Sequence, residues 1–143
     1  SLIAHPTTAP ADPAFDLWAT AELSAAFGAN ATLNLWFAVH AAAARFVLPT
    51  GEGRRADGLW RTTCFEAFLA EPESSAYREW NFAPSGDWAA YAFDSYREGM
   101  QPAEVAAPPY IRVEDNLTWW TLGATVAVPA GQAWQLGLSA VIE

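Results

Sequence analysis

The side chains that could do chemistry gather between residues 58 and 97, where polar residues interrupt an aromatic-rich stretch. Glu66 and Glu79 are set into apolar runs, and Asn81 shares an alternation phase with Glu79. A glutamate on a sheet face must find hydrogen-bond donors or water. Two interpretations stay open: a polar patch that binds the hydroxyl groups of a sugar, or structural ion pairs with arginines of the same region, such as Arg97.

Catalytic interpretations of these residues have less support. Two carboxyl groups, Glu66 and Glu79, could serve a glycosidase. Cys64 could act as a nucleophile only if a base lay beside it. The two histidines, His5 and His40, lie in no recognisable pairing with the thiol. We therefore expect no enzyme activity and assign no catalytic residue.

Trp60 is the aromatic residue best placed to bind a ligand, since it follows a Gly-rich loop and begins an expected strand. The alternative is a tryptophan that caps the end of the domain. Trp60 and Glu66 would share one strand face, but six residues of extended chain separate them by about 20 Å. They could contact one small ligand only if the strand bends.

Composition narrows the class of protein. The chain has 143 residues, which suits one domain, and 52% of them are hydrophobic. Its formal net charge of −9 disfavours nucleic acid and anionic membranes as partners. The single cysteine excludes an internal disulfide and a Cys-rich zinc site, and we expect no metal. No apolar run reaches the roughly 18 residues of a membrane span, and no signal peptide is visible, which favours the cytoplasm.

The elements that must position these residues are short, alternating segments separated by Pro and Gly. Segment 19–30 fits a strand or two helical turns equally well. The pattern predicts a single-domain, all-β antiparallel sandwich, jelly-roll-like, over residues 1–143. The expected strands lie at 32–40, 45–49, 60–69, 77–82, 88–93, 110–114, 117–128 and 134–142, with turns that make hairpins of 77–93 and 110–128.

Two blocks of the chain, GLWRTTCFEAFL at 58–69 and REWNFAPSGDWAAYAFDSYREGM at 78–100, resemble the DOMON-like domains related to family 9 carbohydrate-binding modules. The resemblance implies a β-sandwich with a non-catalytic, ligand-binding role. In the carbohydrate-binding relatives a Trp precedes a strand with a Glu-x-Phe pattern, and both contribute to the sugar slot. Trp60 and Glu66-Ala67-Phe68 match those positions, although the acidic residue that the relatives carry between them has no counterpart here.

We therefore expect a carbohydrate or a sugar-like ligand, bound by tryptophan stacking and polar contacts. The expected ligand-binding residues are Trp60, Glu66, Glu79, Asn81 and Arg97. No cofactor is expected.

Two other functions stay open. Some DOMON relatives bind haem through Met and His, for which this chain offers Met100 with His5 or His40. The third possibility is a structural or interaction domain without a small ligand.

The last expected strand, 134–142, reaches the end of the sequence. If it lies at a sheet edge, its backbone groups would be open to other chains. We expect a further strand to pair beside it, supplied by a separate fragment, by a tail or by a second copy of the chain.

Overall fold

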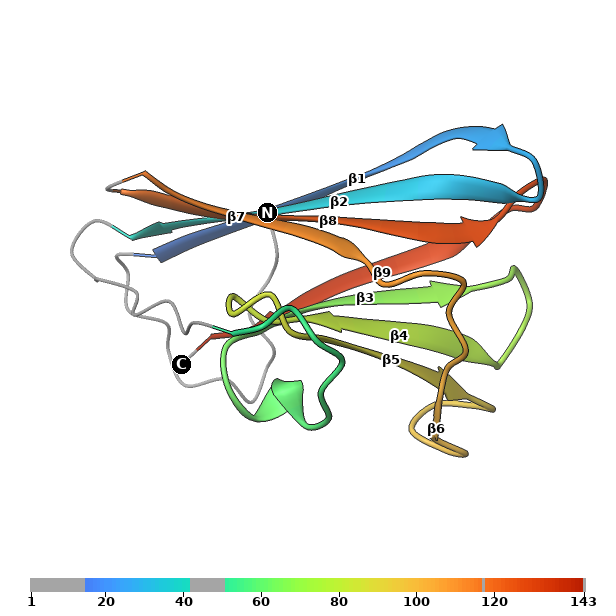
Figure 1. The fold of residues 1–143 in the computed structure, drawn as a ribbon. Coiled ribbons are helices and arrows are strands. Elements are labelled where there is room, and N and C mark those ends of the chain that lie inside the picture. Colours follow the sequence, from blue (N-terminus) through green and yellow to red (C-terminus); the bar gives the residue numbers. More distant parts are fainter. Residues whose placement is uncertain (1–14, 42–50, 117, 143) are drawn as a thin grey trace.

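The computed structural model describes residues 15–41, 51–116 and 118–142, and it consists of two antiparallel sheets packed face to face (Figure 1). The four-stranded sheet has the order β1 (Phe15–Phe27), β2 (Asn30–Ala41), β8 (Trp119–Pro129), β7 (Tyr110–Asn116). The five-stranded sheet has the order β6 (Gln101–Pro102), β5 (Trp88–Phe93), β4 (Tyr77–Phe82), β3 (Cys64–Ala70), β9 (Gln135–Val141). The predicted antiparallel β-sandwich is confirmed. No helix among the described residues has the length and apolar character to cross a membrane.

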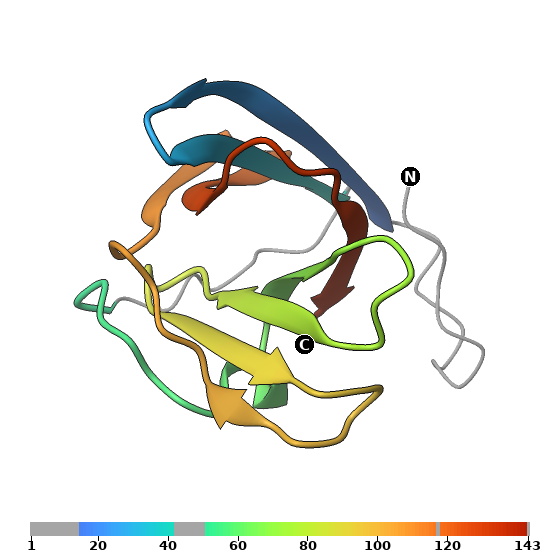
Figure 2. The ribbon, with the colours of Figure 1, turned by 90° about the vertical axis from the view of Figure 1, so that its right-hand side faces the viewer.

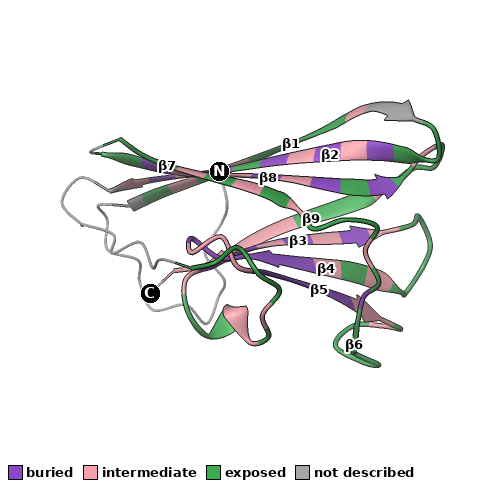
Figure 3. Cartoon of the chain, in the orientation of Figure 1, coloured by how far each residue is buried: buried purple, intermediate pink, exposed green. Residues whose placement is uncertain are grey.

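The core lies between the two sheets and follows the alternation of the strands. Leu33, Leu35, Phe37 and Val39 of β2 are buried, as their shared phase predicts, because every second side chain of a strand points to the same face. From the facing sheet, the ring of Phe65 lies 5.0 Å from that of Phe37. Figure 3 shows the buried residues along β2 and β8 in one sheet and along β3, β4 and β5 in the other.

The ambiguous segment 19–30 forms most of β1, the turn that follows it and the start of β2. β1 pairs with β2 from Phe15↔Ala41 to Phe27↔Asn30, with an irregularity after Ser24. Leu17 and Ala19 pack against the core, whereas Trp18 and Glu22 are exposed. Pairing along β2 decides the extended conformation of this segment.

Both predicted hairpins are confirmed as β4–β5 and β7–β8. The predicted strand 45–49 lies outside the described residues. The predicted strand 60–69 is too long at its beginning: β3 starts at Cys64, and Leu59–Arg61 form a 3-10 turn, η1. Gly58 precedes this turn at φ 75°, a left-handed conformation that glycine adopts readily.

β9 lies at one edge of the five-stranded sheet and β6 at the other, as Figure 2 shows from the side. Among the described residues β9 pairs with β3 alone. Its Leu138 and Ala140 pack against the core. Our prediction of a further strand required that the strand expected at 134–142 lie at a sheet edge, and β9 does. The further strand itself stays a prediction.

Candidate functional site

The candidate site lies on the outer face of the five-stranded sheet, which points away from the other sheet. Directly paired residues of an antiparallel sheet share a face, and Glu66 pairs with Asn81 on one side and Ser139 on the other. In the next row Glu79 pairs with Phe68 and Tyr91. The structure therefore brings three of the predicted residues together: Glu66, Glu79 and Asn81.

Glu66 and Glu79 are diagonal neighbours on adjacent strands, a relation that separates residues by about 7 Å. Asn81 contacts this pair from the middle of the sheet. It is fully buried, and its Nδ2 donates a hydrogen bond of 3.0 Å to Oε1 of Glu79. Its Oδ1 is buried without a hydrogen-bond partner in the described part of the chain. The site thus contains a buried acceptor that no described residue uses.

Burial raises the pKa of the Glu66 carboxyl, and repulsion from Glu79 raises it further, against a hydrogen bond from Ser139. Burial also raises the pKa of Glu79, against the Asn81 hydrogen bond and the attraction of Arg97. In the described ranges the arginines that form ion pairs are Arg54 and Arg112, with other glutamates. The structural ion pair considered for Glu66 is therefore not formed by these described residues.

The segment before β3 is hydrogen-bonded to β5 and folds over the sheet. The Ala56 backbone donates to Trp88 O at 2.9 Å, and the Trp88 backbone donates to Arg54 O at 3.0 Å. The Arg55 guanidinium donates to Ala90 O at 2.6 Å and to Ala103 O at 2.9 Å. These bonds fix where η1 lies, against β3 and β4.

Trp60 reaches the sheet face because it lies in this turn. Its ring lies edge-on to Tyr91, with centroids 5.7 Å apart, and 37% of the residue is exposed. The Tyr91 hydroxyl donates to Asp57 at 2.9 Å; burial, then this carboxylate, raises the pKa of Tyr91 to about 12. Tyr91 is also the cross-strand neighbour of Glu79. The assumption that one extended strand runs from Trp60 to Glu66 was wrong, because Leu59–Arg61 form a 3-10 turn and β3 starts at Cys64.

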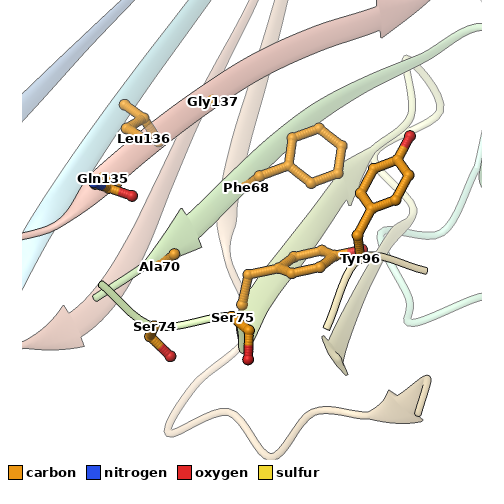
Figure 4. Close-up of a pocket in the computed structure, with 9 residues that line it drawn as sticks. Phe68, Ala70, Ser74, Ser75, Tyr96, Gln135, Leu136 and Gly137 are labelled. Atoms are coloured by element: carbon orange, nitrogen blue, oxygen red, sulfur yellow. The ribbon is translucent and has the colours of Figure 1, made fainter. Parts of the chain in front are cut away.

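A groove of about 520 Å³ opens on the same face, toward the β3–β4 connection (Figure 4). We call it the aromatic groove; it is lined by Phe68, Ala70, Ser74, Ser75, Tyr77, Tyr96, Gln135, Leu136 and Gly137. Figure 4 shows the rings of Phe68 and Tyr96 at one side and Leu136 and Gln135 of β9 at the other. We call Glu66 and Glu79, with Asn81, the carboxyl cluster. Because Phe68 pairs with Glu79, the groove adjoins this cluster.

Sequence reasoning found Phe68 of this groove but missed its other lining residues. Tyr77 gave a usable signal, since it has the same strand phase as Glu79 and Asn81 and therefore lies on their face. Tyr96, Ser74 and Ser75 come from loops, and Gln135 comes from a strand distant in sequence. The pairing of β9 with β3 brings Gln135 beside Ala70 of this groove.

Arg97 lies at the rim of the groove and not within the cluster. It is exposed, with φ 60°, and its guanidinium lies 5.2 Å from the centroid of the Tyr96 ring. Its backbone N–H donates to the Tyr77 hydroxyl at 3.3 Å. Arg97 therefore acts on Glu79 by electrostatic attraction.

The residues considered for haem binding are not brought together in the described part of the chain. His40 lies in β2 of the four-stranded sheet, with its ring 4.8 Å from that of Trp119. Met100 directly precedes β6 of the other sheet, and His5 lies outside the described residues. The described ranges hold no group of three or more His, Cys, Asp or Glu side chains that could bind a metal ion. Haem binding stays a prediction.

Cys64 begins β3, shares the strand phase of Glu66 and is fully buried. Burial, with a smaller contribution from Glu66, raises the pKa of its thiol to about 12. Since the thiolate is the reactive form, we expect no measurable reaction with a disulfide reagent in the native protein at pH 8. One equivalent should react after unfolding in urea. Rapid labelling of the native protein would contradict the buried position of Cys64.

Comparisons of the chain with models of protein families, with curated proteins and with solved structures find no match.

Proposed function

We propose that this domain is a non-catalytic ligand-binding module that binds a carbohydrate or a sugar-like molecule on the outer face of its five-stranded sheet. The observation that carries the proposal is the composition of this one face. It combines the half-buried carboxyls of Glu66 and Glu79 with aromatic rings on either side. Sugars offer apolar ring faces and hydroxyl groups, which such a surface complements.

Each part of the face has a role in this proposal. Trp60, 37% exposed, offers an aromatic surface beside Tyr91. The carboxyls of Glu66 and Glu79 accept hydrogen bonds from ligand hydroxyl groups, and Asn81 holds Glu79 in position. The aromatic groove has room for a sugar ring, and Arg97 lies at its rim beside Tyr96. The resemblance of residues 58–100 to DOMON-like domains related to family 9 carbohydrate-binding modules supports the same proposal.

Calorimetric titration with a panel of mono- and disaccharides tests the proposed function. We expect saturable binding of at least one sugar at millimolar concentration or below. Failure of the folded protein to bind any sugar of the panel would reject the proposal.

Trp60→Ala should weaken binding of that sugar by about tenfold or more, because aromatic anchors carry much of the affinity of such sites. The fold should survive, since Trp60 lies in an exposed turn. The matched control is Trp18→Ala, which removes an exposed tryptophan from the four-stranded sheet and should leave the affinity unchanged. Equal effects of the two substitutions would place the site elsewhere.

A further inference from the structure

Around the carboxyl cluster, the described residues supply more hydrogen-bond acceptors than donors. Its donors are already engaged: Ser139 with Glu66, the Asn81 amide with Glu79, and the Tyr91 hydroxyl with Asp57. A carboxylate has two oxygens and accepts up to about four hydrogen bonds. Acceptor capacity therefore remains on both glutamates.

The unused acceptor on Asn81 is an independent sign of the same imbalance. The residue is fully buried, and Oδ1 has no partner in the described part of the chain. Reversing the amide would bring Oδ1 against the Glu79 oxygen and lose the 3.0 Å hydrogen bond, so the orientation is determined. A buried acceptor without a donor is unfavourable, and it shows that this face has too few donors for its acceptors.

An ammonium group is the best complement to such a cluster. It carries three N–H donors, no acceptor and a positive charge, whereas a hydroxyl group supplies one donor and adds acceptors. The basic side chain that acts on Glu79, Arg97, is exposed and lies over Tyr96. The net charge of −9 also favours the approach of a cation.

We propose that the site takes an amino sugar in its protonated form, with the ammonium group bound between the carboxyls of Glu66 and Glu79 and the sugar ring in the aromatic groove. The inference rests on the proposed function and specifies its ligand class. Phe68 pairs with Glu79 and lines the groove, so one small ligand can contact both parts.

A proton is the competitor of this ammonium group. If a carboxyl of the pair is protonated, it can itself donate a hydrogen bond, and the charge that attracts the ligand is lost. Burial raises the pKa of both glutamates. Affinity for an amine should therefore rise with pH as the pair ionises, while the amine remains protonated. In the described ranges, the ionisable groups that interact with the pair or its neighbours are Cys64 on β3, Tyr91 on β5, Asp57 in the loop and Arg97 at the rim.

The test compares glucosamine with glucose, which has a hydroxyl group in place of the ammonium, by calorimetric titration at pH 5 and pH 7. We expect glucosamine to bind about tenfold more tightly than glucose at pH 7, since hydrogen bonds between charged groups are the stronger ones. The preference should shrink at pH 5 and at high salt. Glu66→Gln and Glu79→Gln should each remove most of it, whereas Glu22→Gln, an exposed glutamate on the other sheet, should not.

The outcomes separate this inference from the proposed function. Equal affinity for glucose and glucosamine would overturn the inference and leave the sugar-binding proposal intact. No binding of either sugar, or of any other in the panel, would overturn both. Saturable binding of Ca²⁺ alone that depends on Glu66, without a preference for the amine, would also overturn it, because a metal ion would then be the group that the acceptors bind.

Discussion

Phe65→Ala should lower the free energy of unfolding by about 3–5 kcal/mol, the range for removing a large buried aromatic side chain. Phe65 is fully buried between the two sheets. Its ring lies 5.0 Å from Phe37 and is stacked 5.2 Å from Trp120, both on the opposite sheet. The substitution leaves a cavity at the centre of the contact between the sheets, which the surrounding strands cannot close.

Urea denaturation followed by tryptophan fluorescence measures this change. The control is Tyr110→Ala, whose side chain is 68% exposed on β7 and whose loss should cost less than about 1 kcal/mol. Since whole domains are stable by only about 5–15 kcal/mol, Phe65→Leu provides a milder variant, expected to lose about 1–2 kcal/mol. Similar losses for Phe65→Ala and Tyr110→Ala would contradict a core centred on Phe65.

Asn81→Asp should be nearly as destabilising at neutral pH, by about 3–5 kcal/mol, the range for leaving an uncompensated charge buried. The substitution keeps the shape of the side chain. It removes the Nδ2 donor to Glu79 and adds a third carboxyl to a face that already holds Glu66 and Glu79. The destabilisation should be largely recovered at pH 4, because protonation removes the new charge.

The direction of this pH dependence follows from proton linkage. A carboxyl whose pKa is raised in the folded state binds protons more strongly there than in the unfolded chain. Stability therefore falls as pH rises from the unfolded pKa to the folded one. Burial raises the pKa of Glu66 and Glu79, so the unsubstituted protein should show the same trend more weakly. Denaturation curves at pH 4 and pH 7 measure both effects.

Asn116→Asp is the matched control, because Asn116 is exposed at the end of β7. It should change stability by less than about 0.5 kcal/mol at either pH. If Asn81→Asp is as stable as the unsubstituted protein at pH 7, the outer face of the five-stranded sheet is open to water at this position, and the argument from a buried acceptor fails.

The sequence by itself determined the fold class and which residues of several strands share a face. In β2 the alternation of Leu33, Leu35, Phe37 and Val39 identified the core side. The shared phase of Glu79 and Asn81, and the hairpin that follows them, also came from local pattern. These features are local because the two-residue period of a strand and the conformation of a tight turn depend on neighbouring residues alone.

The tertiary structure decided how separate segments meet. Glu66 lies beside Asn81, and Ser139 beside Glu66, because β3 pairs with β4 on one side and β9 on the other. No periodicity specifies that register, which arises from packing of whole strands against the core. The burial of Asn81 and the raised pKa of both glutamates follow from the same packing.

Trp60 shows most clearly where local pattern is insufficient. Alternation continued from β3 back to Trp60 and predicted one long strand. Gly58 and the hydrogen bonds of 54–56 to β5 instead fold the chain over the sheet. Those bonds join residues more than 30 positions apart, and such contacts form only when the sheet exists. The residue type was therefore readable in the sequence, but its position beside Tyr91 was a result of the folded sheet.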